Sequence, residues 1–305
     1  MRLSTLGHFL AAVVATTTLT LLSASETSAA LPPLCPNPRY RRELRDMSDN
    51  ERERFFAAMR RILDRPGPGK PSVYDSLAYY HNDQSYYTHN TPSFFPYHRL
   101  ALDRLEKALQ AVDPSVTLPY WDWSADAQAP EASPILSRTW FGTNGQGPNF
   151  CLKDGFYANF RPLYHAADQP GHCIQRRFDA GNRINAFASP ELLADIVGNS
   201  PNFAVFRTRM EGYPHGGVHN GIGGTLSSMY SPNDPIFYMH HAFIDKLWYD
   251  WQAIDPNNRI YQYYGYDPTE KREVNLYQTL RPPFASRRVG DGMSVRHNGL
   301  CYKYL

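Results

Sequence analysis

The chain has 305 residues, of which 42% are hydrophobic and 20% are charged, and its formal net charge is +2 at pH 7. This near balance excludes the strongly basic surface that nucleic-acid-binding domains present, so no nucleic-acid partner is expected.

The first residues have the pattern of a secretory signal peptide. Arg2 precedes a short apolar stretch, and small residues follow up to Ala30, just before Leu31-Pro32-Pro33. The apolar stretch is too short to cross a bilayer comfortably, and no second stretch of that kind occurs. We therefore predict a signal peptide over residues 1–30, a secreted protein without a membrane span, and a single domain over residues 31–305.

Periodic apolar residues beyond the signal predict a mainly helical fold with long loops and few short strands. Ser48 with Glu51 three residues later is a capping box for the first helix. Residues 120–175 are rich in Gly, Pro, Asn and Ser, which predicts a long loop region. Helices are expected at 48–63, 72–81, from about Pro96 to Asp113, at 189–197, at 202–210 and at 235–253.

Four cysteines remain after the signal, and none of them has the spacing of a Cys-x-x-Cys metal site. An even, widely spaced set in a secreted chain predicts two disulfides. Three pairings are compatible with the sequence. We favour Cys151–Cys173 across the long loop region and Cys35–Cys301 between the chain ends.

Six histidines form two sets of three, each inside a run of aromatic residues. His215 and His219 are four residues apart, so on a helix they share one face. Pro214 suits a first helical position, which places His215 at the start of that helix. A purely structural role is the alternative, but burying so many imidazoles without partners is unfavourable. The two sets are His81, His89 and His98, and His215, His219 and His241.

The types of residue in the two sets indicate the metal. Zinc hydrolases of the His-Glu-x-x-His type have glutamate directly after the first histidine, whereas this chain has Gly216 there. No carboxylate has a ligand-like position, which argues against non-haem iron. Two sets of three imidazoles are typical of copper that cycles between Cu(I) and Cu(II), and three ligands per ion leave coordination positions free.

At this point the chain resembles a known family, the type-3 copper oxidases, which include tyrosinases, catechol oxidases and haemocyanins. The similarity extends over about residues 35–305. It implies a central antiparallel helical bundle that holds a dinuclear copper site, within a single tyrosinase-like copper-binding catalytic domain over 31–305. The motifs that carry it are 94–99 (FFPYHR), 119–123 (PYWDW) and 234–241 (DPIFYMHH).

The resemblance also assigns the ligands of the two copper ions. Neighbouring residues on a helix diverge by about 100°, so His240 and His241 cannot both face one ion. The family pattern counts seven residues from Asp234 to the ligand and selects His241. Asp245, one turn further, is expected to orient an imidazole, with an ion pair to an arginine or lysine as the alternative. Copper A is thus assigned to His81, His89 and His98, and copper B to His215, His219 and His241.

Three further positions bear on catalysis. Glu211 matches the family's water-ordering glutamate, with a solvated loop charge as the alternative. Gly216 stands where relatives that hydroxylate monophenols well often have asparagine. Tyr87 replaces a cysteine that many relatives cross-link to the second copper A histidine, so His89 must be held by packing.

We therefore predict a dicopper oxidase that converts o-diphenols to o-quinones with O2 and has weak or no activity on monophenols. Its partners are a phenolic small molecule and O2. One alternative is a tyrosinase or o-aminophenol oxidase that acts on a secondary-metabolite or peptide intermediate. The other is a haemocyanin-like oxygen carrier, although carriers of that type are usually large assemblies.

Overall fold

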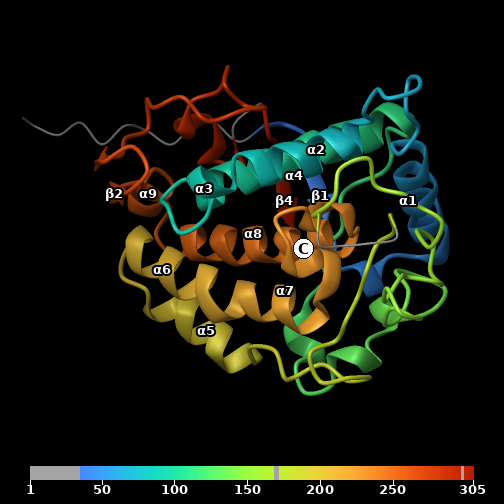
Figure 1. Cartoon of the computed structure of the whole chain (residues 1–305). Helices are drawn as coiled ribbons and strands as arrows, with labels where there is room; N and C mark the ends of the chain where they lie inside the picture. The colour runs from blue at the N-terminus through green and yellow to red at the C-terminus, as the bar shows by residue number, and fades with distance from the viewer. Residues whose placement is uncertain (1–34, 168–171, 297–298) are drawn as a thin grey trace, which may run out of the picture. The chain divides into compact units, whose positions relative to one another are not determined.

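The computed structural model describes residues 35–167, 172–296 and 299–305 (Figure 1). The signal peptide expected over residues 1–30 lies outside these ranges. Within them, no helix combines the length and the apolar character needed to cross a membrane.

The described chain is mainly helical, as predicted, and its longest helices, α4 and α8, have 19 residues each. Between α4 and α5 the described residues form short 3-10 turns, loops and isolated β-bridges, which agrees with the predicted loop region. The helices are α1 (Asp49–Arg61), α2 (Val73–Asp83), α3 (Ser85–Thr88), α4 (Phe94–Val112), α5 (Pro190–Asn199), α6 (Phe203–Met210), α7 (Gly216–Ile222), α8 (Ile236–Ile254) and α9 (Pro256–Arg259).

Local capping determines where the first two helices begin. The Ser48 side chain accepts from the amide of Glu51, whose carboxylate accepts in return from the Ser48 amide. Ser72 and Asp75 form the same reciprocal pair at the start of α2. Both pairs satisfy amide groups that have no partner within the helix, which confirms the predicted helix starts.

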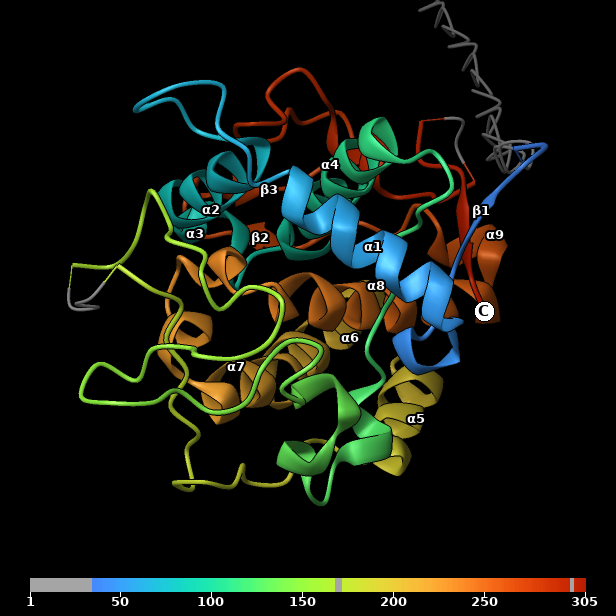
Figure 2. The ribbon, with the colours of Figure 1, turned by 90° about the vertical axis from the view of Figure 1, so that its right-hand side faces the viewer.

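Helix α8 lies at the centre of the bundle. In both views α2 and α4 lie on one side of it, and α5, α6 and α7 lie on the other (Figures 1 and 2). Its side chains are buried around most of its circumference, as expected for a helix covered on all sides. The core also contains the tryptophans Trp121, Trp123, Trp248 and Trp251, each with no exposed surface.

Two pairs of short strands complete the fold. Strand β1 (Arg39–Arg41) pairs in parallel with β4 (Tyr302–Tyr304), and β2 (Tyr266–Asp267) pairs antiparallel with β3 (Arg272–Glu273). The disulfide Cys35–Cys301 links the segments that lead into β1 and β4, and Cys151–Cys173 closes a loop in the long irregular region. Both favoured disulfide pairings are confirmed.

Candidate metal centre

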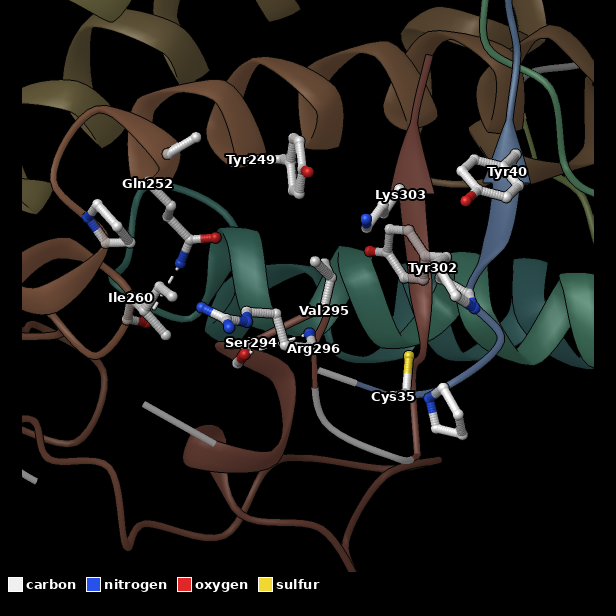
Figure 3. Close-up of a pocket in the computed structure, with 14 residues that line it drawn as sticks. Cys35, Tyr40, Tyr249, Gln252, Ile260, Ser294, Val295, Arg296, Tyr302 and Lys303 are labelled. Carbon is white, nitrogen blue, oxygen red and sulfur yellow. Dashed lines mark hydrogen bonds between the residues drawn. The ribbon is translucent and has the colours of Figure 1, made fainter. Parts of the chain in front are cut away.

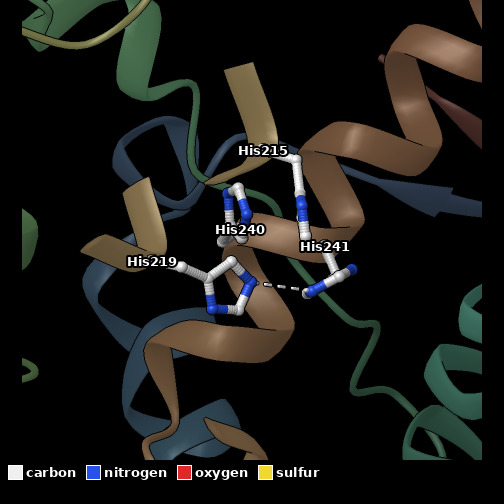
Figure 4. Close-up of side chains that lie close together, drawn as sticks. All are labelled: His215, His219, His240 and His241. Carbon is white, nitrogen blue, oxygen red and sulfur yellow. Dashed lines mark hydrogen bonds between the residues drawn. The ribbon is translucent and has the colours of Figure 1, made fainter. Parts of the chain in front are cut away.

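Two groups of histidines meet in the middle of the bundle. Within each group, one potential ligand nitrogen from every member lies within 4.8 Å of those of the others. The first group comes from α2, from the residue that follows α3, and from α4. The second comes from the turn that precedes α7, from α7 itself and from α8 (Figure 4). The groups are His81, His89 and His98, and His215, His219, His240 and His241. All six histidines selected from the sequence are present, and His240 is the additional member.

The segment before α7 differs from the prediction. Residues Glu211–His215 form a π-helical turn with Pro214 inside it, and α7 begins only at Gly216. Gly212 has a non-helical ψ of −122°, which kinks the chain. The prediction that Pro214 opens the helix was therefore wrong. Wide π turns of this kind are common at functional sites, and here the turn still brings the ring centroids of His215 and His219 within 4.5 Å.

Backbone carbonyl groups orient five of the six selected imidazoles. A carbonyl oxygen can only accept, so each Nδ1 that contacts one carries the proton and leaves the Nε2 lone pair available. Ligand histidines at metal sites are usually held in this way. The Nδ1–oxygen distances are 2.7 Å from His81 to Met229, 3.1 Å from His89 to Ser85, 2.7 Å from His98 to Phe94, 3.1 Å from His215 to Glu211 and 2.6 Å from His219 to Leu226.

The remaining ring nitrogens fit a metal better than a purely structural role. Nε2 of His81, His98 and His215 is buried without a hydrogen-bond partner among the described residues. Leaving such polar atoms unpaired is unfavourable unless something else satisfies them. Nε2 of His219 lies 3.2 Å from Nε2 of His241, although the His219 proton is held at Nδ1. The donors therefore suit a metal that prefers neutral imidazole nitrogen, such as copper.

His89 is held by the short helix that precedes it. Its Nδ1 contacts the carbonyl of Ser85 and lies 3.3 Å from the hydroxyl oxygen of Thr88. Tyr87 occupies the position of the absent cysteine, and its ring packs against Arg281, whose guanidinium carbon is 4.0 Å from the ring centroid. Hydrogen bonds as well as packing therefore fix this imidazole.

His240 and His241 have different environments despite being adjacent. The His241 ring stacks on His98 with centroids 4.5 Å apart, so it links the two groups. The centroid of the His240 ring lies 5.4 Å from that of His215, on which it stacks, and 6.0 Å from that of Trp123. Neither of its nitrogens forms a hydrogen bond of normal geometry with the described residues, although an interaction with the His215 backbone raises its pKa slightly against the effect of burial. His241 is thus the better candidate ligand, and His240 packs directly behind the second group.

Burial keeps these imidazoles neutral. It lowers the pKa of His89 and of His219 from 6.5 to about 4. It also lowers the pKa of the remaining five to well below 6.5, and neighbouring imidazoles add to the effect at each of them. Desolvation disfavours the charged form, so the nitrogen lone pairs remain available to a metal at neutral pH.

Acid should destabilise the copper-free protein. Between pH 6.5 and about 4 the unfolded chain binds more protons than the folded one at His89 and His219, so stability is full above pH 6.5 and falls toward pH 4. Glu211 has the opposite effect, because its pKa is raised to about 7 and its protonation therefore stabilises the folded state as the pH falls. This single group is outweighed by the seven imidazoles. We expect the thermal midpoint, followed by circular dichroism, to fall from pH 7 to pH 4. A constant or rising midpoint would contradict this.

Glu211 is a buried residue of the site, with only 8% of its surface exposed. Its carboxylate accepts from the backbone amide of Asn90, next to His89, and from Arg207 at 2.7 Å. Burial raises the pKa of Glu211 to about 7, and the bonds to Asn90 and Arg207 limit the rise. The alternative of a solvated loop charge is therefore wrong.

Gly216 lies at an open position beside the second group. A Cβ atom built there meets nothing within 4 Å, so packing does not require glycine. The residue borders a cavity of about 410 Å³ whose other walls are Asp179, Asn185, Ala186, Gly212, Tyr213, Gly217 and Asn220. A side chain at position 216 would therefore enter free space.

Asp245 does not orient an imidazole, contrary to the prediction. One of its oxygens accepts from Arg99 at 2.6 Å, and the other accepts from the hydroxyls of Tyr302 and Tyr304, also at 2.6 Å each. Arg41 lies 3.5 Å from the second oxygen. The ion-pair alternative is the observed one, although the network is buried and joins β1 and β4 to α4 and α8.

Comparisons with known proteins identify the family and the fold. The family model for the common central domain of tyrosinase matches residues 71–254. The chain belongs to the tyrosinase family. It is 32% identical over 305 aligned residues to Tyrosinase ustQ of Aspergillus flavus, which covers 93% of this chain and 84% of that protein. It is 33% identical over 262 residues to a tyrosinase of Streptomyces glaucescens, covering 77% and 89%.

A solved structure shares the fold of this chain. A variant of the polyphenol oxidase of Thermothelomyces thermophila shares the fold, with a TM-score of 0.75 over 90% of this chain and 91% of that one, at 24% identity. Tyrosinase-family enzymes are copper oxidases that act on phenols with O2, and the imidazole groups of this member have the donor atoms that copper requires.

Proposed function

We propose that this tyrosinase-family protein binds two copper ions and oxidises o-diphenols to o-quinones. His81, His89 and His98 would hold one ion, and His215, His219 and His241 the other. Bound copper supplies the redox chemistry, in which two diphenols lose four electrons and four protons while one O2 becomes two water molecules. The observation that carries the proposal is the convergence of two groups of neutral, carbonyl-oriented imidazoles, joined by the stacked rings of His98 and His241.

The protein's own residues would bind the phenol and handle its proton. Glu211 would order a water molecule and accept a phenolic proton through it. Its pKa, raised to about 7 and therefore close to the working pH, supports this role. Gly216 would leave room for the substrate ring but would supply no side-chain amide. We infer that deprotonated diphenols are turned over well and that monophenols, which are harder to deprotonate and must be hydroxylated first, are turned over poorly.

A matched pair of substrates tests this specificity. We expect the initial rate on 4-methylcatechol to exceed that on 4-methylphenol by at least about tenfold, equivalent to about 1.4 kcal/mol in the barrier, with a lag on the monophenol. Gly216→Asn should raise the monophenol rate and leave the diphenol rate nearly unchanged. Equal rates without a lag would indicate a tyrosinase instead. Copper-loaded protein that leaves the catechol unoxidised would favour the oxygen-carrier alternative, and a preference for o-aminophenol would favour that substrate class.

We further propose that residues 1–30 are removed on secretion and that residues 31–305 are the catalytic domain. The two disulfides support this proposal, since they persist in oxidising compartments. Expression in a secreting host should yield extracellular protein with an N-terminus near Leu31. Protein that stays inside the cell with an intact N-terminus would contradict the proposal.

A further inference from the structure

A second cavity lies away from the histidine groups. Its volume is about 630 Å³, and none of the histidines of either group lines it. One wall includes Tyr249 in the last half of α8, eight residues beyond His241 and therefore about 12 Å further along the helix. The opposite wall is formed by the segment from Cys35 to Tyr40 and by β4 (Figure 3).

The charged residues of this cavity all have the same sign. Among the described residues, Arg296 and Lys303 line it and no carboxylate does. Neither side chain forms an ion pair within the described part of the chain. The nearby Asp250 of α8 is already paired with Lys246 at 2.7 Å. The described part of the chain therefore gives this cavity two positive charges and no counter-ion.

Arg296 has an unsatisfied donor at this position. Its Nε atom is buried and has no hydrogen-bond partner among the described residues. The guanidinium lies beneath Tyr249 and Gln252 in Figure 3, while Gln252 donates to the carbonyls of Ile260 and Met293. Arg296 as a whole is partly exposed and lines the cavity, so its guanidinium can meet an acceptor that enters there.

The remaining walls are aromatic and apolar. Tyr302 donates its hydroxyl to Asp245 and forms part of the lining, and Tyr40 is 45% exposed. Small-molecule sites typically have volumes of about 300–1,000 Å³, mostly apolar linings and a few fixed polar groups. This cavity has those features, and the apolar contributors include Pro36, Pro38, Pro256, Ile260 and Val295.

We propose that this cavity is a binding site for a small aromatic carboxylate, separate from the copper centre. The planar guanidinium of Arg296 matches a carboxylate through two parallel N–H donors, and Lys303 adds a second positive charge. The ring of the ligand packs between the tyrosine and proline side chains. An inorganic anion would leave that apolar wall uncovered, and a neutral aromatic would leave the Arg296 donor unpaired. An aromatic carboxylate satisfies both features.

Calorimetric titration of the copper-loaded protein with 2-naphthoate tests the proposal. We expect saturable binding that is at least about tenfold weaker for the neutral 2-naphthamide and for Arg296→Gln, where about tenfold corresponds to the loss of one charge-assisted contact. Arg296→Lys should restore part of the affinity, because it keeps the charge but not the two-donor geometry. Lys153→Gln, at an exposed position outside the cavity, is the matched control and should bind like the wild type.

Two further variants keep the outcome decisive. His98→Ala should bind 2-naphthoate with unchanged affinity, and loss of binding there would show that the probe occupies the histidine groups instead. Lys303→Gln should weaken binding even if Arg296→Gln fails to fold, which its thermal midpoint would reveal. Absence of binding to the wild type, equal affinity for the amide, or full affinity in both cavity variants would overturn the proposal. None of these results depends on whether diphenols are oxidised.

Discussion

Replacing His98 with alanine should remove one of two copper ions and abolish turnover, whereas His240→Ala should retain both ions. His98 has its Nδ1 proton held by the Phe94 carbonyl at 2.7 Å, and its buried Nε2 has no other partner in the described structure. His240 is equally buried, but its ring stacks on His215 and packs against Trp123, whereas the His241 ring stacks on His98 of the first group. Adjacent helical side chains diverge by about 100°, so only one of His240 and His241 can face the ion.

Copper content per chain, measured by elemental analysis after dialysis, is the readout. We expect two equivalents in the wild type and in His240→Ala, and one in His98→Ala. His241→Ala is the matched control for its neighbour and should also lose one equivalent. Equal losses in the His240 and His241 variants would show that the choice of ligand is wrong. One equivalent in the wild type would contradict the dicopper proposal itself.

Variants of Glu211 should separate two roles of this carboxylate, which are to accept a proton from the substrate and to hold the segment that contains His89. It accepts from the Asn90 amide, which adjoins His89, and Asn90 itself has a left-handed φ of 58°. It also pairs with Arg207 at 2.7 Å. Glu211→Gln keeps an oxygen acceptor for Asn90 but lacks a titratable proton site. Glu211→Ala removes both the acceptor and the titratable group. It leaves the Asn90 amide and the Arg207 guanidinium unpaired, which should lower the free energy of unfolding by about 1–3 kcal/mol.

We therefore expect Glu211→Gln to keep its copper but to lose at least about tenfold in kcat, a modest value for general acid–base catalysis. In the wild type, kcat/KM should rise as the pH increases through about 7, because the carboxylate must be ionised to accept a proton. The glutamine variant should lack that rise. Glu211→Ala should in addition release copper from His81, His89 and His98, because the His89 segment is no longer held.

Arg207→Met tests whether the ion pair between Arg207 and Glu211 sets the pKa of Glu211. Arg207 is 17% exposed, and its loss leaves the Asn90 contact intact. We expect it to raise the pH at which kcat/KM increases and to leave the copper content unchanged. An unaltered pH profile in Glu211→Gln would exclude Glu211 as the proton acceptor, and full copper content in Glu211→Ala would exclude its role in holding His89.

Local features of the sequence predicted much of this molecule. The capping pair at Ser48 lies within four residues of the helix it begins, and the proline after Asp113 ends α4. The spacing of His215 and His219 on one helical face, together with the family motifs, selected six histidines that meet in the bundle. Such features are recognisable because the interacting groups are close in the chain.

What only the tertiary structure decided involves groups that are far apart in sequence. Asp245 was expected near an imidazole, but Arg99 and Tyr302, 146 and 57 residues away, take its oxygens. The carbonyl that orients His81 belongs to Met229, 148 residues further along. Burial of Glu211 and the unpaired Nε of Arg296 likewise depend on which segments pack together. Residue types and their spacing determined which side chains can bind a metal. Long-range packing decided which ion pairs and hydrogen bonds each of those side chains forms.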